Sequence, residues 1–337
     1  SCGSLRARRC RPRARGRKLK RNTDMKNKAA PIRVRNGLVA ALDVGTTKVC
    51  CLIAQLDSNA VLAPEEGLKI IGIGHQVSDG LRSGTVVDLE KTEASIRATV
   101  EAAEQMAGKN ISGVFVNLSC GQPKSRLIAY EVSIAGHEIG DADLRRILDP
   151  AVLKDGLPKE RELEHTIPVG YSVDSNRGVR DPRGMFGERL GVNMHIISAL
   201  SGPVRNLETS VQRCHLEVHD KVVSAYASAL ATLVEDETQL GVTCIDMGGG
   251  TTSIAVYFDG ELVHTDIVPI GGVHVSNDIA RGLSTPLDQA ERMKTLYGST
   301  MASSSDDREI IKAPLVGEAK STEASHIPRS MLVGIIR

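Results

Sequence analysis

Two short segments of the sequence carry residue types that could bind a phosphate group. The first runs Asp43-Val44-Gly45-Thr46-Thr47-Lys48, and the second runs Asp246-Met247-Gly248-Gly249-Gly250-Thr251-Thr252. Glycine tolerates the positive φ angles of a tight corner, and a glycine-rich corner turns several backbone N–H groups toward one concave anion seat. The threonine hydroxyls add hydrogen-bond donors. We therefore interpret each segment as a phosphate-binding corner.

An aspartate precedes each corner, where the leading strand would end. A carboxylate that faces a bound phosphate there implies a Mg²⁺ ion between the two groups, held directly or through water. The two aspartates, Asp43 and Asp246, lie about 200 positions apart. A single Asp-x-Gly occurs by chance in a chain of this length, so two unrelated hairpins are one interpretation. The repeated order of strand, Asp-x-Gly, threonine and strand favours the other, a duplicated phosphate clasp.

Apolar and β-prone residues on both sides of each corner predict β-hairpins that position the corners. The first hairpin spans residues 37–54, and residues 245–257 contain the second. Residues 69–77 are predicted to add a strand to the first hairpin, followed by a helix over residues 89–106 and a strand over residues 114–118. Together these elements predict a β-β-β-α-β unit in which a helix packs on a sheet, as in the α/β class.

The sequence pattern changes over residues 119–192 to short β-like pieces and loops rich in Asp, Gly and Arg, which predicts an inserted small α+β subdomain. Short β-like pieces there flank a helix predicted over residues 141–153, with Asp141 as its N-cap. A strand over residues 193–200 and a helix over residues 203–214 return the chain to the first half.

A helix rich in small residues, predicted over residues 221–233, connects the two halves. Alanines four positions apart permit close approach of another helix or of a ligand, although an ordinary buried helix fits as well. After the second hairpin we expect a strand over residues 264–269 and a helix over residues 273–281. Thr285 is expected to cap the next helix, with Pro286 at its first position.

Composition bounds the class of protein. The 337 residues, 41% hydrophobic and 25% charged, are enough for two globular, soluble domains. No apolar run approaches the roughly 18 residues that span a bilayer. Aromatic residues make up 2% of the chain, which argues against base-stacking platforms for nucleic acid. The seven cysteines contain no Cys-x-x-Cys pair, which favours free thiols in a reducing cytosol.

Residues 1–36 are expected to be a separate, disordered basic leader. Residues 1–24 hold ten Lys or Arg residues against Asp24 alone, so the rest of the chain has 32 basic and 40 acidic residues. Such a run of like charges is not expected to fold, and it would bind polyanions. The chain begins at Ser1 and Met25 would serve as a natural start, so a non-native extension is one interpretation. A nucleic-acid or lipid arm is the other.

Two Asp-Gly-Thr hairpins joined by a small-residue helix resemble the actin-like ATPase fold of actin, the 70-kDa heat-shock chaperones and sugar kinases. Within that superfamily the sequence resembles the FtsA family of bacterial cell-division proteins, from about residue 37 to residue 337. The hairpins are specific to the superfamily only, whereas the insert and its flanks carry the family-specific residues. These are Ser78, Asp79, Gly80, Gly84, Val86, Asp88, His165, Thr166, Ile167, Pro168, Tyr171, Asp174, Gly178, Asp181, Pro182, Gly184, Met185, Gly187, Arg189 and Leu190.

The resemblance implies ATP as the ligand, with Mg²⁺ positioned by Asp43 and Asp246. Matching residues of the two corners would hold the phosphates. They are Gly45, Thr46, Thr47, Lys48, Gly248, Gly249, Gly250, Thr251 and Thr252.

The resemblance also extends the site beyond the phosphates. Glu291 and Lys294 match the family helix that reaches the ribose and base, and Gly271 and Gly272 would line the same cleft. Glu291 and Lys294 are near neighbours on a helix, so a plain surface ion pair is the alternative. ATP hydrolysis needs an ordered water and a base near the γ-phosphate, and the sequence identifies no catalytic residue. We therefore expect slow turnover or none.

FtsA proteins bind ATP, polymerise, and tether the tubulin-like protein FtsZ to the inner membrane through a C-terminal amphipathic helix. The resemblance thus implies a cytoplasmic scaffold, peripheral on the inner face of the membrane at the division site. Its partners would be the FtsZ C-terminal tail, further copies of itself in filaments and other division proteins, with no specific nucleic acid. The family's later Gly-rich adenosine loop and terminal helix have no counterpart before Arg337. We therefore expect the second half to be incomplete, nucleotide binding to be weak, and the membrane tether to be absent.

Two other functions fit parts of the pattern. A small-molecule kinase, such as a sugar kinase, would need a carboxylate base in a sugar-sized pocket. A pilus-assembly protein of similar fold would bind an inner-membrane peptide. On the FtsA-like interpretation we expect an α/β, actin-like fold of two halves, each a β-sheet plus helices, with an inserted small α+β subdomain after which the chain returns to the first half. The expected segments are the leader 1–36, the first-half subdomain 37–118, the insert 119–192, the return and connecting helix 193–240, and the second half 241–337.

Overall fold

The computed structural model describes residues 37–56, 67–149, 156–317 and 325–337. The expected basic leader of residues 1–36 therefore lies outside the described residues, as does the end of the helix predicted over residues 141–153. Within the described ranges, no helix is both long enough and apolar enough to cross a membrane.

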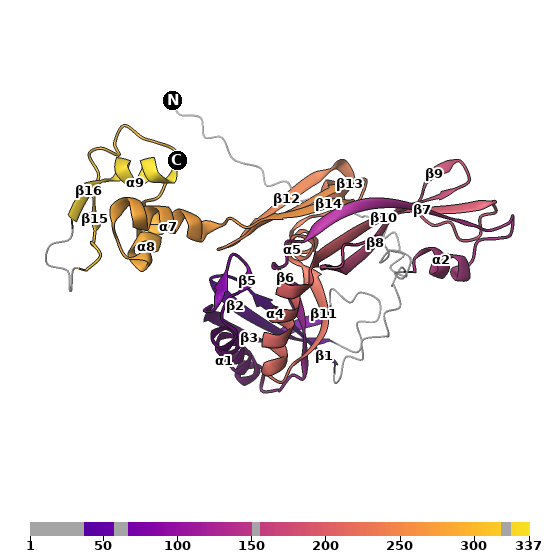
Figure 1. The fold of residues 1–337 in the computed structure, drawn as a ribbon, viewed down its shortest axis with the longest axis horizontal. Coiled ribbons are helices and arrows are strands. Elements are labelled where there is room, and N and C mark those ends of the chain that lie inside the picture. The colour runs from indigo at the N-terminus through magenta and orange to yellow at the C-terminus, as the bar shows by residue number, and fades with distance from the viewer. Residues whose placement is uncertain (1–36, 57–66, 150–155, 318–324) are drawn as a thin grey trace, which may run out of the picture. The chain divides into compact units, whose positions relative to one another are not determined.

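A five-stranded sheet forms the first half of the described chain (Figure 1). In spatial order its strands are β11 (Glu217–Val223), β6 (Gly113–Leu118), β1 (Leu38–Val44), β2 (Lys48–Leu56) and β3 (Leu68–Val77). β1 is antiparallel to β2 and parallel to β6, so the strand that leads into the first corner is paired on both edges. A two-stranded hairpin, β4 (Leu81–Arg82) and β5 (Thr85–Val86), follows β3.

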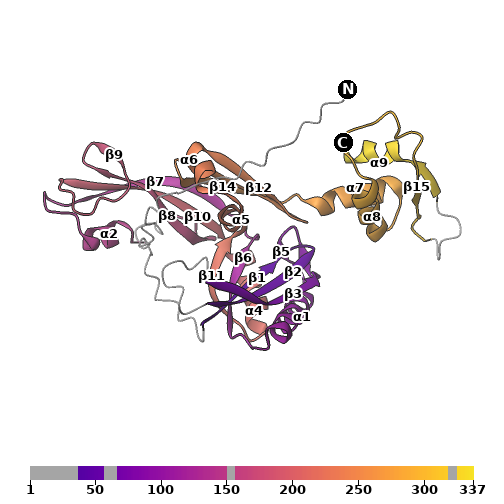
Figure 2. The ribbon, with the colours of Figure 1, turned by 180° about the vertical axis from the view of Figure 1, so that it is seen from behind.

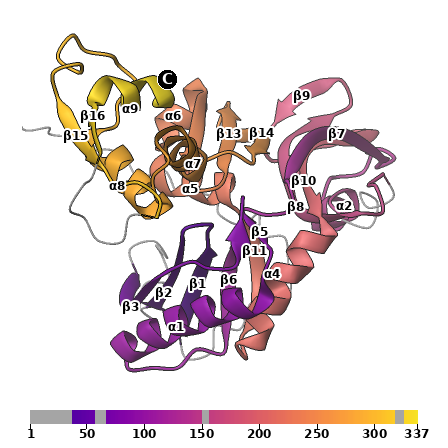
Figure 3. The same ribbon diagram turned by 60° about the vertical axis from the view of Figure 1, so that its left-hand side comes forward.

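Two helices cover one face of this sheet, α1 (Leu89–Ala107) and α4 (Ser201–Arg213) (Figure 3). Apolar residues of both helices join alternate residues of the strands in one buried core. α1 lies very close to β3 because two glycines, Gly72 and Gly74, face it. A Cβ atom on Gly74 would collide with the carbonyl oxygen of Thr99. The first-half strands and helices therefore form a two-layer unit.

The insert forms a separate, antiparallel sheet. Residues 193–200, which were expected to return the chain to the first half, belong to this sheet because they continue the strand that begins at Arg189. In spatial order its strands are β7 (Lys124–Ser133), β10 (Arg189–Leu200), β8 (Arg161–Val173) and β9 (Asn176–Val179). The helix α2 (Asp141–Ile147) contacts β7 and β10. The prediction that Asp141 is its N-cap is wrong. Gly140 occupies that position, because the side chain of Asp143 reaches back to accept a hydrogen bond from the Gly140 N–H at 3.1 Å.

The connecting helix is shorter than predicted. α5 (Ser224–Thr232) begins three residues later than the predicted start at Lys221, because residues 221–223 continue β11 and pair with β6. α5 lies between the first sheet and a three-stranded second sheet (Figure 2). That sheet consists of β12 (Val242–Met247), β13 (Thr252–Phe258) and β14 (Glu261–Val268), and a short helix, α6 (Glu235–Leu240), precedes it. In the part of the chain that the structure describes, β12 pairs only with β13 and is an edge strand.

The last part of the chain has its own small core. It is built from α7 (Gly272–Leu283), α8 (Leu287–Tyr297), β15 (Ile310–Ala313), β16 (Ser325–Pro328) and α9 (Arg329–Ile336). The predicted cap of α8 is wrong by one position. Pro286 is the N-cap, because the Thr285 hydroxyl instead donates a hydrogen bond to the carbonyl oxygen of Pro314.

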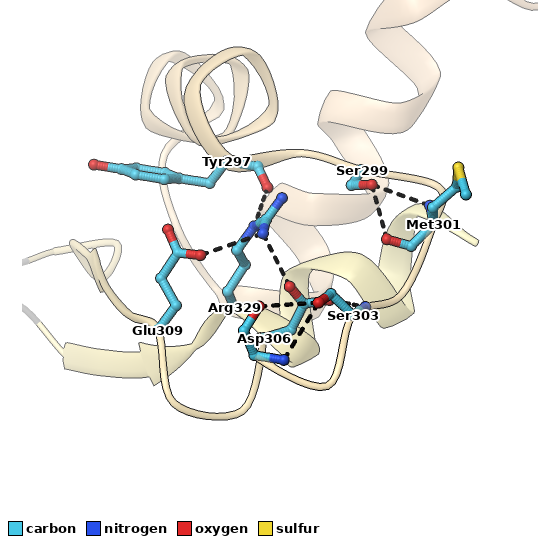
Figure 4. Close-up of polar contacts among 8 residues, drawn as sticks. Tyr297, Ser299, Met301, Ser303, Asp306, Glu309 and Arg329 are labelled. Atoms are coloured by element: carbon cyan, nitrogen blue, oxygen red, sulfur yellow. Dashed lines mark hydrogen bonds and ion pairs between the residues drawn. The ribbon is translucent and has the colours of Figure 1, made fainter. Parts of the chain in front are cut away.

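Arg329 joins the start of α9 to the polar loop that follows α8 (Figure 4). Its guanidinium group lies 2.9 Å from Asp306 Oδ1 and 3.2 Å from Glu309 Oε2, and it donates to the carbonyl oxygen of Tyr297 at 2.9 Å. The side chain of Asp306 is only 2% exposed, so Arg329 neutralises a carboxylate that would otherwise be buried alone. This contact orders the loop.

Candidate functional site

The two corners meet around one cavity of about 200 Å³. The first corner (residues 45–48) joins β1 to β2, and the second corner (residues 248–251) joins β12 to β13. Both aspartates that precede the corners also face this cavity. The lining residues are Asp43, Gly45, Thr46, Thr47, Lys48, Asn117, Ser119, Ser224, Asp246, Met247, Gly248, Gly249, Gly250, Thr251 and Ser253.

The corners approach each other so closely that side chains are excluded from the second one. A Cβ atom on Gly249 would lie 2.7 Å from the hydroxyl oxygen of Thr47, and one on Gly250 would collide with Thr46. The Thr46 hydroxyl also accepts a hydrogen bond from the N–H of Gly84 at 2.9 Å, which joins the β4–β5 turn to the first corner. Glycine is therefore required here by space, and backbone rather than side chains forms this part of the cavity wall.

Each aspartate is held by one neutral donor. The amide nitrogen of Asn117 donates to Asp43 Oδ1 at 2.8 Å, and the hydroxyl of Ser228 donates to Asp246 Oδ2 at 2.8 Å. Burial raises the pKa of Asp43, and the negative charge of Asp246 adds to this effect. The hydrogen bond from Asn117 and the positive charge of Lys48 oppose the rise. The two carboxylates are thus close enough to repel each other across the cavity.

Polar groups other than the two aspartates complete the wall. The Oδ1 atom of Asn117 is buried and has no hydrogen-bond partner. Ser224, the first residue of α5, contributes a buried hydroxyl. Asp43, Asp246 and Lys48 are the ionisable side chains among the described lining residues, so neither a histidine nor a glutamate stands there.

Some predicted site residues lie outside the cavity wall. Thr252 turns away from it and donates from its hydroxyl to the carbonyl oxygen of Ile270 at 2.8 Å. Gly271 and Gly272 pack against the second corner, where the Gly272 N–H donates to the carbonyl oxygen of Gly248 at 3.1 Å. These glycines support the corner without lining the cavity.

Glu291 and Lys294 contact the start of α7. The Lys294 ammonium group donates to the carbonyl oxygen of Gly272 at 2.9 Å, to Ser276 at 2.8 Å and to Glu291 at 2.7 Å. Hydrogen bonds from Lys294 and Ser276 lower the pKa of Glu291 although its burial acts the other way. The pair is therefore part of a network between α7 and α8, beside the second corner.

Sequence reasoning missed four polar groups of the site and its support, namely Asn117, Ser119, Ser224 and Ser228. Asn117 is a lone amide in the otherwise apolar strand Gly113–Leu118, which is a signal that the pattern did offer. Ser224 and Ser228 lie four positions apart, so they fall on one face of α5. The sequence pattern predicts that the small residues of that helix permit close approach of another helix or of a ligand, and it assigns no role to the serine hydroxyls.

Comparison with known proteins identifies the family. The profile described as cell division protein FtsA matches residues 243–333, and that of the SHS2 domain inserted in FtsA matches residues 121–198. The cell division protein FtsA of Rhizobium meliloti (strain 1021) is 43% identical over 307 residues, which cover 90% of this chain and 69% of that protein. This chain belongs to the FtsA family. FtsA of Escherichia coli (strain K12) is 33% identical over 280 residues, covering 83% of this chain and 65% of that protein.

Membership of the FtsA family makes the chain an actin-like protein of bacterial cell division, and it confirms the predicted family, fold class and division role. Among solved structures, the PilM-PilN type IV pilus biogenesis complex matches with a TM-score of 0.54 and 15% sequence identity, over 77% of this chain and 69% of that chain. At this identity the likeness concerns the fold alone. Neither the sugar kinase nor the pilus-assembly protein is favoured as the function.

Proposed function

We propose that this member of the FtsA family binds ATP together with Mg²⁺ in the cavity between its two corners. The observation that carries the proposal is that Asp43 and Asp246, about 200 positions apart in the sequence, line one small cavity. The cavity fits phosphate and a hard divalent cation, because its wall combines carboxylate oxygens, hydroxyls, glycine backbone and one ammonium group. The unpartnered Oδ1 of Asn117 adds an acceptor that a hydrated ligand would satisfy.

Each part of the wall has a distinct task in this proposal. The backbone N–H groups and threonine hydroxyls of the first and second corners hold the phosphates, and Lys48 balances part of their charge. Asp43 and Asp246 face the cation. Mg²⁺, when bound, would supply positive charge that reduces the repulsion between the two carboxylates and the triphosphate in one cavity. Glu291 and Lys294 are proposed to contact the ribose and base.

We propose that hydrolysis is slow or absent. An attacking water needs an acceptor positioned near the γ-phosphate. Asp43 and Asp246 are the carboxylates among the described lining residues, and both are assigned to the cation. Ser224 is a poor base at neutral pH, because a hydroxyl does not accept a proton readily. ATP would therefore act chiefly as a ligand that organises the cavity.

We further propose that the protein is a scaffold that links the FtsZ ring to the inner face of the cell membrane. Membership of the FtsA family supports this role, with the FtsZ C-terminal tail, further copies of the chain in filaments and other division proteins as partners. A pull-down with a peptide of the FtsZ tail tests the partner. Capture of the peptide is expected. Failure of a protein that still binds ATP would count against the FtsZ role but not against the nucleotide site.

Calorimetric titration with ATP and Mg²⁺ tests the site. Asp246→Ala is expected to weaken binding at least tenfold, because the cation loses one of its two charged partners, about 1.4 kcal/mol or more. Asp278→Ala is the matched control, since Asp278 is an exposed carboxylate on α7, and it should leave the affinity unchanged. Equal affinity of the Asp246 variant and the unaltered protein would contradict the assignment.

A further inference from the structure

Each of the two cavity carboxylates, Asp43 and Asp246, is hydrogen-bonded to an uncharged side chain from outside its own corner. Asp43 accepts a hydrogen bond from Asn117 and Asp246 accepts one from Ser228, each at 2.8 Å. Among the described residues, neither carboxylate takes part in a salt bridge. Both are therefore oriented by uncharged groups.

A neutral donor affects a carboxylate differently from a cationic partner. A lysine or arginine would neutralise the charge and compete with a bound cation, whereas an amide or hydroxyl fixes the orientation and leaves the charge in place. Each donor also uses only one carboxylate oxygen. Oδ2 of Asp43 and Oδ1 of Asp246 have no hydrogen-bond partner among the described residues, so they remain free for a ligand.

Both donors come from well-anchored elements. Asn117 lies on β6, directly opposite Asp43 in the parallel pairing of β1 and β6. Ser228 lies in the middle of α5, which packs on β12 and contacts the first sheet through β6 and β11. The two carboxylates are thus each held from outside their own corner.

The unpartnered Oδ1 atom of Asn117 is evidence that a ligand binds beside it. Only the NH₂ group can donate to Asp43, so the amide orientation is set and Oδ1 is the atom left without a partner. A buried acceptor without a donor is unfavourable, because it has lost its hydrogen bonds to water. Asn117 lines the cavity, so a hydrated cation bound there would offset this cost.

We propose that Asn117 and Ser228 are positioning residues, which aim Asp43 and Asp246 at the divalent cation that accompanies the nucleotide. In addition, Oδ1 of Asn117 offers a third oxygen to the hydrated cation. This inference rests on the proposed binding of ATP with Mg²⁺, and it makes the Mg²⁺ requirement, rather than the affinity for nucleotide itself, the property that the two residues determine.

The test measures ATP binding as a function of Mg²⁺ concentration, and again in EDTA, for Asn117→Leu and Ser228→Ala. Each variant is expected to need about ten times more Mg²⁺ for half-maximal binding, as is typical when the support of a metal ligand is removed. The affinity in EDTA should change less than twofold. Ser228→Thr keeps the hydroxyl and should restore the normal Mg²⁺ requirement. Ser210→Ala, on α4 and away from the cavity, is the matched control.

The outcomes separate this inference from the proposed function. An unchanged Mg²⁺ requirement in both variants would overturn the positioning role while leaving the ATP site intact. An equal loss of affinity with Mg²⁺ and in EDTA would also overturn it, because the residues would then act only on the shape of the cavity. Failure of the unaltered protein to bind ATP would overturn the proposed function and this inference together.

Discussion

Lys294 donates a hydrogen bond of 2.9 Å to the carbonyl oxygen of Gly272, whose own N–H bonds to Gly248 in the second corner. A residue of α8 is therefore linked to the cavity through a chain of two hydrogen bonds, although it does not line the cavity. Lys294 could act on a nucleotide in two ways, by contact with the ribose and base or by support of the corner. These two effects are separable by experiment.

Lys294→Met should weaken ATP binding about tenfold and tripolyphosphate binding less than threefold. If Lys294 contacts the nucleoside, its substitution removes a charged hydrogen bond of about 1.5–3 kcal/mol from the ATP complex. Tripolyphosphate has no nucleoside, so its complex does not lose this bond. Competitive titration with the two ligands measures both affinities. Arg292→Met, an exposed change on the same helix, should affect neither. Equal losses for the two ligands would show that Lys294 acts only by supporting Gly272.

Gly249→Val should abolish measurable ATP binding, because even a Cβ atom at this position would lie 2.7 Å from the Thr47 hydroxyl and 2.5 Å from its methyl group. The side chain would push the two corners apart. Gly202→Ala is the control, since a Cβ on this exposed glycine of α4 meets no atom within 4 Å. The control should keep full affinity and unfold at the same or a slightly higher temperature. ATP binding by the valine variant would show that the corners need not touch.

Asp88→Ala should lower the free energy of unfolding by about 1 kcal/mol, the usual effect of removing an N-cap. Asp88 caps α1 by accepting a hydrogen bond from the N–H of Lys91 at 3.1 Å. Urea unfolding followed by circular dichroism measures the change. Glu101→Ala, on the exposed face of the same helix, should stay within about 0.5 kcal/mol of the unaltered protein. Similar losses in both variants would indicate that the cap contributes nothing special.

His195→Gln should flatten the dependence of stability on pH in the acidic range. Burial, together with the nearby His264 and His165, lowers the pKa of His195 to about 4, and both ring nitrogens lack partners. The unfolded chain binds a proton near the ordinary value of 6.5, so the native protein loses stability as pH falls from 6.5 towards 4. This one group accounts for at most about 1.4 kcal/mol per pH unit.

Urea unfolding at half-unit steps between pH 4 and 6.5 measures this slope for each protein. The exposed His326→Gln variant should keep the slope of the unaltered protein. A His195→Gln variant with the same slope as the unaltered protein would show that His195 is protonated in the native state.

The corners were predictable because their chemistry is local. A glycine-rich segment between two β-prone runs predicts a turn. The positive φ angles expected of its glycines are not observed at Gly45, Gly248, Gly249 or Gly250. Gly249 and Gly250 are instead required because Thr47 and Thr46 of the other corner leave no room for a Cβ atom.

The pairing partners of a strand are not specified by such a local pattern. Residues 221–223, predicted as the start of the connecting helix, extend β11 because Leu118 and its neighbours in β6 pair with them. Val222 and Val223 are β-branched, so their local preference agrees with this pairing.

The supporting residues of the site illustrate the same limit. Asn117 becomes a partner of Asp43 only when β6 lies beside β1, and Ser228 meets Asp246 only when α5 packs on β12. No spacing in the sequence encodes either contact. Gly140 likewise is the N-cap of α2, and Asp143 in the first turn accepts a hydrogen bond from its N–H, whereas Asp141 was expected to cap the helix with its own side chain.

The unequal pairing of the two leading strands gives the cavity one stiff side and one compliant side. β1 is bonded on both edges, whereas β12 is bonded on one edge among the described strands. Backbone amides of β12 should therefore exchange with deuterium sooner than those of β1. A ligand that bridges the two corners should slow the exchange of the β12 amides more than that of the β1 amides. Entry and exit of such a ligand would then proceed by loosening on the Met247 side, while the Asp43 side stays in place.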